Sequence, residues 1–405
     1  MNPSDRPVLP TMVIFNVALV ALIVATGGFM AFDAATIALP TEFATAPGVD
    51  FNAFYGASTQ VNERDFDTLY DFERFRASAP AVQALAWLYP PTMLLLIEPL
   101  AALPYPVAKL GWMLATIAAF VLACVRLGLR SGGAVALVLT SAPVLFTLAI
   151  VQASAFFLLP LVVAMTEAHR RPVTAGLCAA LLTVKPQYGV VLPIFLLAIG
   201  ARRAFAVAAC GTIAFVALSL MRYGVPAWQA YLTDGMAWGR DLATGGYNYF
   251  SMTLYQPLAI WGAGGVSDAV QGAIVAFTWV CVAATARFAS PRLALGVALL
   301  GTAASAPYFN VYDGAVAVLG LLVVAGCAEA GRVPRAALLT LYAFPALCWV
   351  SATALVLRGA HPFLLVLGNL CTLYVLSLLS GPSLRHGWCL FARTWPSRSS
   401  ALTPS

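Results

Sequence analysis

Charged residues are scarce in this sequence. Of the 405 residues, 9% are charged and 61% are hydrophobic, whereas about 25% of the residues of a soluble domain are charged. So few charges cannot cover that much apolar surface, which excludes a water-soluble globular fold. Apolar runs of roughly 20 residues, long enough to cross a hydrocarbon core of about 30 Å, recur along nearly the whole chain. The sequence therefore predicts an integral membrane protein.

Clusters of metal-ligating or basic residues are also missing. Of the eight cysteines, all except Cys389 lie singly in apolar stretches, with no C-x-x-C pair and no histidine at ligand spacing, so neither a disulfide framework nor a zinc site is indicated. The Asp65-Phe66-Asp67 pair lacks further ligands at fixed spacing, and we expect no metal and no cofactor. The net charge of +6 is dispersed between apolar segments, which argues against a nucleic-acid partner.

The apolar segments predict about 11 to 13 membrane crossings. They must be helices, because unpaired backbone groups are costly in lipid and the alternation of a membrane barrel is absent. The predicted fold class is therefore all-α, a polytopic transmembrane helical bundle. The segments lie at about 11–32, 86–103, 107–127, 133–150, 153–168, 172–185, 187–200, 204–221, 267–286, 293–305, 314–328, 336–355 and 363–380.

Orientation follows from arginine in the short loops, which marks the cytoplasmic side. The loops near Asn248, Tyr308 and His361 then lie outside. Upstream the parity fails, because four apolar segments separate the loop before Tyr89 from Arg170. One of these segments, or one of the short pair around Lys185, is predicted not to span. The cytoplasmic positions are His169-Arg170-Arg171, Arg202-Arg203, Arg287 with Arg292, Arg332 with Arg335, and Arg385, Arg393 and Arg398 in the tail.

We predict a single membrane domain over 1–384 and a cytoplasmic tail over 385–405. The polar insertion 33–83 is predicted to be the first non-cytoplasmic loop, and it holds half of the sixteen acidic residues. A second non-cytoplasmic loop, 222–266, is rich in Trp and Tyr, as expected at a membrane boundary. Apolar spacing within 33–83 predicts two short amphipathic helices lying in the interface, carried by Phe51, Phe54 and Tyr55 and by Leu69, Phe72 and Phe75.

Asp50 stands at the start of the first of these helices. It is a candidate general base that takes a proton from an acceptor hydroxyl at the membrane surface. The alternative is a helix N-cap, which position alone favours by roughly two to one.

Lys185, one of two lysines in the chain, lies inside an apolar stretch. A buried ammonium costs at least about 2.5 kcal/mol at a helix centre, so such a lysine is a functional candidate. Pro186 predicts a helix break there. A phosphate beside the break would satisfy the ammonium and the freed amides, with Gln187 adjacent. The alternative, of roughly even weight, is a lysine that snorkels to the interface.

Asp313 lies between two apolar segments on the predicted outer side, with Tyr308, Asn310 and Tyr312 beside it. These groups suit sugar hydroxyls, although a helix cap within an aromatic belt explains them equally well. Three further residues are candidates. Tyr89 precedes Pro90-Pro91, which a helix start also explains. Gln152 lies between two apolar segments and Glu98 within one, where a bond to a neighbouring helix explains each polar side chain equally well.

In this order, these residues resemble glycosyltransferase family 87, a family of the GT-C membrane fold that includes polyprenyl-phosphate-mannose-dependent mannosyltransferases. The resemblance extends over about residues 50–313. Its motifs are Asp50-Phe51 with Phe54-Tyr55, Leu69-Tyr70-Asp71, Tyr89-Pro90-Pro91 leading to Glu98-Pro99-Leu100 and Leu103-Pro104, Gln152, Lys185-Pro186-Gln187, Asn248 with Ser251, and Pro307-Tyr308 with Tyr312-Asp313.

The resemblance implies an inverting transfer of a sugar, with mannose favoured, from a polyprenyl-phosphate donor to a lipid or glycan acceptor among the membrane lipids. It implies a site on the non-cytoplasmic side of the cell (inner) membrane and an aspartate in the first outer loop as base. Asp50 matches that aspartate, which favours base over cap. Lys185 and Gln187 are then expected at the donor phosphate. The expected substrate-binding residues are Tyr89, Gln152, Asn248, Tyr308, Asn310, Tyr312 and Asp313.

The main alternative is a transporter or flippase of a lipid-linked or small polar substrate, using Glu98 and Lys185 as intramembrane charges. A transporter more often shows two halves with matching broken helices, and only the region of Lys185 looks broken. A membrane scaffold without catalysis leaves the buried lysine without a purpose.

Overall fold

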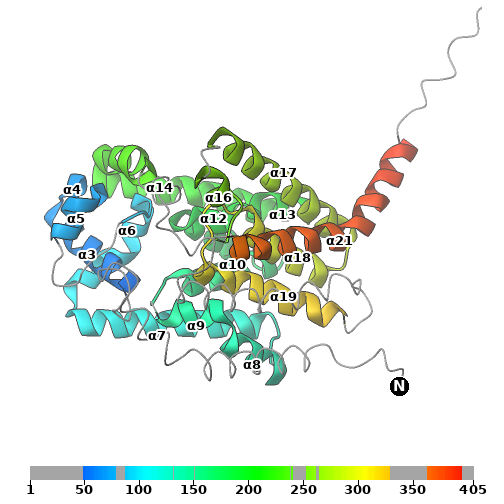
Figure 1. The fold of residues 1–405 in the computed structure, drawn as a ribbon, viewed down its shortest axis with the longest axis horizontal. Coiled ribbons are helices and arrows are strands. Elements are labelled where there is room, and N and C mark those ends of the chain that lie inside the picture. The colour runs from blue at the N-terminus through cyan, green and yellow to red at the C-terminus, as the bar shows by residue number, and fades with distance from the viewer. Residues whose placement is uncertain are drawn as a thin grey trace, which may run out of the picture.

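The chain forms an all-helical bundle in the part that the structure describes, which confirms the predicted membrane fold class (Figure 1). Two predicted membrane segments, 11–32 and 336–355, lie outside the described residues. This computed structural model describes residues 49–78, 87–130, 132–149, 151–237, 239, 252–260, 264–328 and 363–394.

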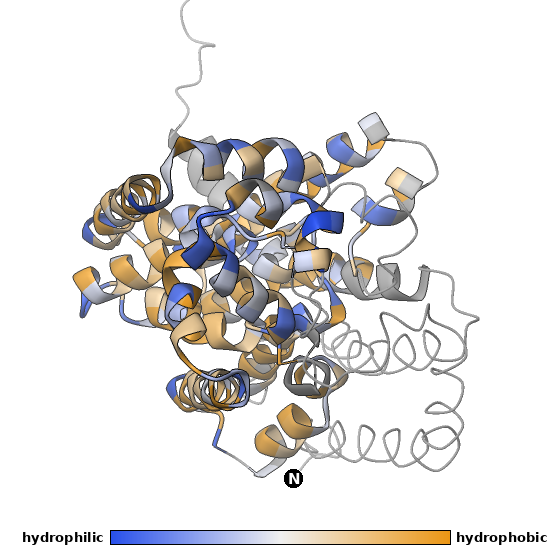
Figure 2. Cartoon of the chain, turned by 90° about the vertical axis from the view of Figure 1, so that its left-hand side faces the viewer, coloured by the Kyte–Doolittle hydropathy of each residue, from blue (hydrophilic) through white to orange (hydrophobic). Residues whose placement is uncertain are grey.

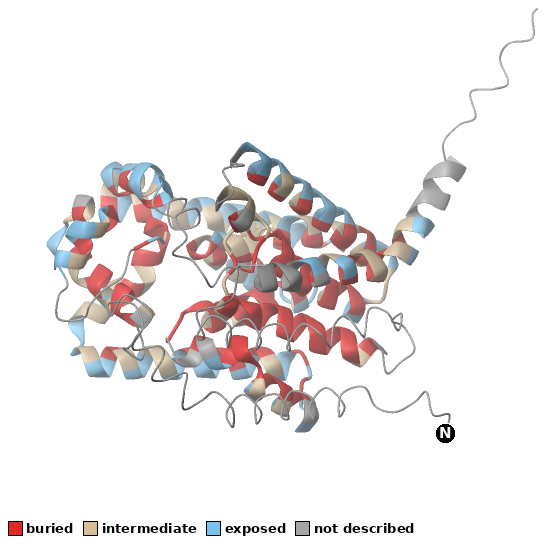
Figure 3. Cartoon of the chain, in the orientation of Figure 1, coloured by how far each residue is buried: buried red, intermediate tan, exposed pale blue. Residues whose placement is uncertain are grey.

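Within the described residues, three continuous helical stretches are long and apolar enough to cross a membrane: Tyr105–Arg126, Arg202–Gly235 and Gly265–Phe288. They contain α7 (Tyr105–Arg126), α14 (Arg202–Ala230) with the one-turn π-helix η5 (Tyr231–Gly235), and α17 (Gly264–Phe288). Their outward side chains are apolar: Ile213 is 70% exposed and Met221 78%. Figures 2 and 3 show apolar residues along the outer helices and the buried residues in the middle of the bundle. Such a surface suits lipid rather than water.

Shorter helices complete the bundle, and the predicted segment 133–150 is interrupted, as two helices separated at Ser141. The break predicted at Lys185, between segments 172–185 and 187–200, is confirmed. Unsatisfied backbone groups at such breaks are tolerated in membrane proteins where neighbouring helices bury them. The elements are α8 (Gly132–Thr140), α9 (Ala142–Ala149), α10 (Ser154–Thr166), α11 (Pro172–Leu181), η4 (Leu182–Val184), α12 (Pro186–Gly189), α13 (Leu192–Ala198), α16 (Tyr255–Ile260), α18 (Pro291–Ser305), η6 (Val311–Gly314), α19 (Ala315–Ala328) and α21 (Phe363–Thr394).

One end of the bundle carries six of the described arginines, and we call it the arginine end: Arg126, Arg170, Arg171, Arg202, Arg203 and Arg292. Four others lie at the opposite end: Arg64, Arg74, Arg76 and Arg222. At the arginine end, the last turn of α7 meets the end of α10, where Arg126 Nη1 lies 2.7 Å from Glu167 Oε1. The start of α18 meets the same place, because Arg292 donates to the carbonyl of Leu127 at 3.4 Å. Arg170 lies just before the start of α11, and Arg202 is the first residue of α14. These two helices pack together near their starts, at Gly176.

The opposite end carries α3 (Val49–Glu63), α4 (Phe66–Tyr70), α5 (Phe72–Ser78), α6 (Pro91–Ile97) and the 3-10 helix η3 (Glu98–Ala102), at the left of Figure 1. Both ends of the predicted segment 86–103 bond to this group. Tyr70 Oη donates to the carbonyl of Tyr89, and Tyr55 Oη donates to the carbonyl of Leu103, each at 2.9 Å. The segment therefore returns to the end where it began, and it is the one that does not span, which restores the parity upstream of Arg170.

Helix α3 is buried in protein instead of lying freely in the interface. The Phe51 and Phe54 side chains are 0% and 1% exposed. Their rings contact Tyr105 and Trp112 of α7, with centroid distances of 5.7 and 5.2 Å. The spacing predicted the helix correctly, but α7 covers its apolar face. The second predicted amphipathic helix is two short helices, α4 and α5, which are separated at Asp71.

Close packing joins α11 to α14 at Gly176. A Cβ atom there would lie 2.6 Å from Val207 Cβ and 2.7 Å from the carbonyl oxygen of Ala204. Small residues that let two helix backbones approach are typical of membrane helix pairs. Farther along α14, Gly224 has a φ of +79° and kinks the helix before Pro226, a conformation that favours glycine. Helix α4 contacts the chain on both sides of the kink: the Phe66 ring contacts Tyr223 just before it, and the Tyr70 ring contacts Tyr231 after it, with centroid distances of 5.8 Å in each pair.

Candidate active site

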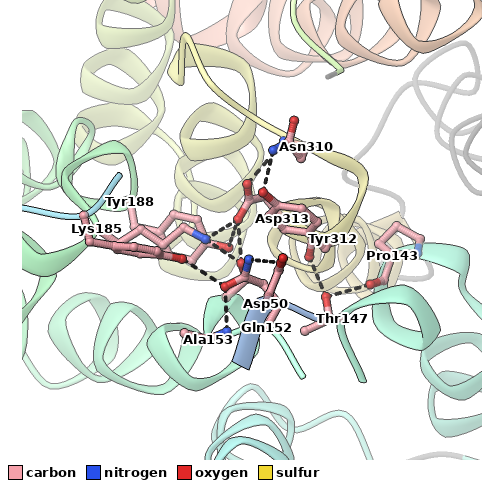
Figure 4. Close-up of polar contacts among 12 residues, drawn as sticks. Asp50, Pro143, Thr147, Gln152, Ala153, Lys185, Tyr188, Asn310, Tyr312 and Asp313 are labelled. Carbon is pink, nitrogen blue, oxygen red and sulfur yellow. Dashed lines mark hydrogen bonds and ion pairs between the residues drawn. The ribbon is translucent and has the colours of Figure 1, made fainter. Parts of the chain in front are cut away.

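Asp50 lies in the first turn of α3 and points toward residues of four other segments (Figure 4). The helix already begins at Val49, so Asp50 is not the N-cap. Its Oδ2 accepts a hydrogen bond from Gln152 Nε2 at 2.6 Å. The other carboxylate oxygen accepts no hydrogen bond from the described residues, and the side chain is partly exposed. Within the described part of the chain, one oxygen of Asp50 is thus held and the other accepts no hydrogen bond.

Gln152 orients Asp50 through hydrogen bonds at both the nitrogen and the oxygen of its side-chain amide. Its Oε1 accepts from Tyr89 Oη at 2.9 Å and from its neighbouring amide, Ala153 N–H, at 2.7 Å. The turn that carries Gln152 is strained, because Val151 has a φ of +57°, and positive φ is unusual for a β-branched residue. Strain of this kind persists only where surrounding contacts hold it. The turn places the glutamine amide against the Asp50 carboxylate.

Lys185 sits at the predicted helix break, between η4 and α12, with φ −138° and ψ 74°. Its side chain is 2% exposed, so the snorkelling alternative was wrong. The Nζ lies 2.5 Å from Asp313 Oδ1 and donates to Ser154 Oγ. It also lies over the rings of Tyr188 and Tyr312, at 4.9 and 5.6 Å from their centroids. The buried charge is paired and its cation faces two aromatic rings, as a desolvated ammonium requires.

Asp313 is the acceptor at the centre of this buried group. Its Oδ1 accepts from Lys185, from Ser154 Oγ at 2.7 Å and from Tyr188 Oη at 3.2 Å. Its Oδ2 accepts from the backbone N–H of Asn310 at 3.2 Å. The last bond is half of a capping box that closes η6. The predicted cap is therefore present, and the same carboxylate is the counter-ion of the buried lysine.

The two carboxylates of the cluster differ in their environment. Burial raises the pKa of Asp50 from its usual 3.8 to about 7, against the opposing effects of the Lys185 charge and the Gln152 hydrogen bond. Asp313 is 2% exposed and bound by four donors, which is about the number of lone-pair sites that a carboxylate has. Asp50 has one oxygen without a donor among the described residues and a pKa raised to about 7, which are the properties of a general base.

The structure brings together most of the residues that the sequence singled out. Gln187 lies beyond the break in the first turn of α12, and Tyr308 packs against Tyr255 of α16 with a centroid distance of 5.8 Å. Asn248 lies outside the described residues. Glu98 is paired with Arg222 and Tyr223 of α14. The cluster itself consists of Asp50, Tyr89, Gln152, Lys185, Asn310, Tyr312 and Asp313.

Three members of the network had not been singled out from the sequence. Ser154 and Tyr188 bind the Lys185–Asp313 pair, and Thr147 Oγ1 donates to the carbonyl of Tyr312 at 2.7 Å. Ser154 is two residues after Gln152, and Tyr188 is three after Lys185, so proximity in sequence was the available signal. In the described part of the chain, no three His, Cys, Asp or Glu side chains converge as metal ligands do.

Comparison with known proteins gives one match to a family. The model of glycosyltransferase family 87 matches residues 87–307, more than half of the chain. The matched range contains Tyr89, Gln152 and Lys185, while Asp50 and Asp313 lie outside it. No curated protein and no solved structure matches the chain.

Proposed function

The chain belongs to glycosyltransferase family 87, and from that premise we propose that it transfers a sugar, mannose by preference, from a polyprenyl-phosphate donor to a lipid or glycan acceptor. Asp50 is the proposed general base. A membrane protein that is helical throughout its described part suits a donor whose long prenyl chain stays in the bilayer.

The observation that carries this proposal is the asymmetry of the Asp50 carboxylate. Gln152 fixes one oxygen through a 2.6 Å hydrogen bond, and the second oxygen, which accepts no hydrogen bond from the described residues, is the one proposed to accept the proton of an acceptor hydroxyl. A catalytic base is most effective when its pKa lies near the working pH, and burial raises the pKa of Asp50 to about 7. At neutral pH such a carboxyl group exists in both protonation states and can take up and release a proton in each cycle.

The proposed reaction is a single displacement at the anomeric carbon. As Asp50 removes the proton from the acceptor hydroxyl, that oxygen forms the new glycosidic bond and the bond from the anomeric carbon to the phosphate oxygen breaks, with inversion. The prenyl phosphate leaves as an anion whose conjugate acid has a low pKa, so the reaction needs no general acid. The proton ends on Asp50 and passes to solvent after release.

The polar groups around Asp50 suit a sugar. Tyr89, Asn310 and Tyr312 are only partly buried. The side chains of Asn310 and Tyr312 lie in the same cluster as the carboxylate (Figure 4), and the Tyr89 hydroxyl donates to Gln152, which binds Asp50. Gln152 contributes to the site by holding Asp50 in place. Substrate-binding roles for Gln187, Asn248 and Tyr308 stay predictions.

We further propose that the site faces away from the cytoplasm of the cell membrane. The Asp50 cluster lies at the end of the bundle opposite the arginine end. Short arginine-rich loops remain on the cytoplasmic side, and the arginine end carries Arg126, Arg170, Arg171, Arg202, Arg203 and Arg292.

The test is a transfer assay with purified protein in liposomes, a panel of radiolabelled polyprenyl-phosphate sugars, and membrane lipid extract as acceptor. We expect label from a polyprenyl-phosphate hexose, mannose first, to appear in a new glycosidic product. Label that crosses the bilayer in unchanged chemical form would indicate a flippase. Transfer from nucleotide sugars, with none from any polyprenyl-phosphate sugar, would refute the donor class.

A further inference from the structure

A buried ion pair stands beside Asp50, and its lysine is already occupied. Of the three N–H groups of the Lys185 ammonium, one bonds Asp313 and one bonds Ser154, while the rings of Tyr188 and Tyr312 lie beneath the charge. With 2% of its side chain exposed, the lysine does not present an open ammonium to an incoming phosphate.

Asp313 is equally committed. Three donors meet its Oδ1 and the Asn310 amide meets its Oδ2. A carboxylate in this position has little capacity left for sugar hydroxyls. Removal of either partner of a buried pair leaves the other charge uncompensated, whereas replacement of both by neutral groups of similar size is often tolerated.

We propose that Lys185 and Asp313 are positioning residues that set the charge environment of Asp50, and that neither is a ligand of the donor phosphate or the sugar. The inference rests on the proposed function, since it assigns to both residues an effect on the catalytic base.

The direction of each charge follows from its sign. Burial raises the pKa of Asp50, the positive charge of Lys185 lowers it, and the negative charge of Asp313 raises it by less than Lys185 lowers it. The uncharged groups that face Asp50 are Gln152, Tyr89 and Tyr312. The pair as a whole therefore favours the ionised base.

The side chains that shift the pKa of Asp50 are Lys185, Gln152 and Asp313. Other charged groups on the elements packed against α3 are Glu98 on η3, Lys109 and Arg126 on α7, and Asp65 at the start of α4. Lys109 is the second lysine of the chain and lies 5.7 Å from the centroid of the Tyr105 ring. It is the matched control for the loss of one positive charge.

The experiment is a pH titration of the Asp50 carboxyl group by infrared spectroscopy on purified protein. The absorption of the protonated group is assigned by its loss in Asp50→Asn. We expect Lys185→Met to move the midpoint upward by about one pH unit or more, the usual effect of losing an opposite charge nearby. The double variant Lys185→Met/Asp313→Asn should titrate between wild type and Lys185→Met, and Lys109→Met should titrate with wild type.

An unchanged midpoint in Lys185→Met, or a double variant that titrates with Lys185→Met, would overturn the inference. If Lys185→Met does not fold because Asp313 is left unpaired, the double variant, which removes both charges, tests the inference by itself. Its midpoint should lie above that of wild type because the lysine has the larger effect, and a midpoint equal to wild type would refute the inference.

Donor kinetics separate this role from phosphate binding. The double variant should keep its KM for the polyprenyl-phosphate sugar within about threefold, whereas loss of a charge-assisted bond to phosphate would raise KM by about tenfold or more. The infrared midpoint needs no substrate. If the wild-type protein transferred no sugar while the variants titrated at the expected midpoints, the proposed function would be refuted. The effect of Lys185 and Asp313 on the titration of Asp50 would still stand.

Discussion

Replacement of Gln152 by leucine should disable Asp50 by raising its pKa. The change removes the 2.6 Å hydrogen bond to Oδ2, which lowers the pKa of Asp50 in the wild type. A hydrogen bond to a charged group contributes about 1.5–3 kcal/mol, and 1.36 kcal/mol corresponds to one pKa unit. The acid limb of kcat/KM should therefore move from about pH 7 to about pH 8–9, and activity at pH 7 should fall by about 7- to 80-fold.

The assay is the pH dependence of kcat/KM for sugar transfer in liposomes. Gln271→Leu is the matched control, because Gln271 is also buried and donates to the carbonyl of Ser305 at 2.8 Å, outside the Asp50 cluster. Both variants should lose stability, but only Gln152→Leu should shift the limb. A Gln152→Leu protein with its limb still near pH 7, or an equal shift in Gln271→Leu, would refute the role given to Gln152.

Two further predictions concern the wild-type pH profile and the bundle. In the wild type, kcat/KM should rise about tenfold per pH unit below 7 and level off above it, because the base must be deprotonated and its pKa is raised to about 7; a flat profile between pH 5 and 7 would contradict this. Gly176→Ala should destabilise the protein by about 1–3 kcal/mol through overpacking against α14, measured by thermal unfolding in detergent. Gly111→Ala, which adds a methyl group where no atom lies within 4 Å, should not, and equal melting temperatures would contradict the packing argument.

Much of the fold could be predicted because a chain in lipid must satisfy its backbone hydrogen bonds internally, which here leaves helices. Apolar length identified the helices, and Lys185-Pro186 correctly predicted a break. Hydropathy could not tell that 86–103 returns to its starting end, because that depends on the bonds of Tyr70 and Tyr55 to its backbone carbonyls. Likewise, the spacing of Phe51 and Phe54 predicted a helix, but a period of 3.6 residues does not reveal whether lipid or α7 covers the apolar face.

For the site, the sequence pointed to costly residues but not to their pairing. Lys185 in an apolar stretch and Asp313 between two apolar segments could both be recognised as unusual. Their ion pair, which joins residues 128 positions apart in the chain, follows only from the tertiary packing of α10, α12 and η6. The cap role of Asp50 and the snorkelling of Lys185 were reasonable from local pattern. The first was wrong because α3 already includes Val49, and the second because Lys185 is buried.

The most direct test of the account is the turnover of Asp50→Asn with a polyprenyl-phosphate sugar at pH 8, together with donor binding by the same protein. Asparagine keeps the size of the side chain and cannot take a proton. We predict that kcat falls by about 10²- to 10⁴-fold, the usual contribution of a general base, while donor affinity stays close to that of wild type. An Asp50→Asn protein that turns over at the wild-type rate would contradict the assignment of the base.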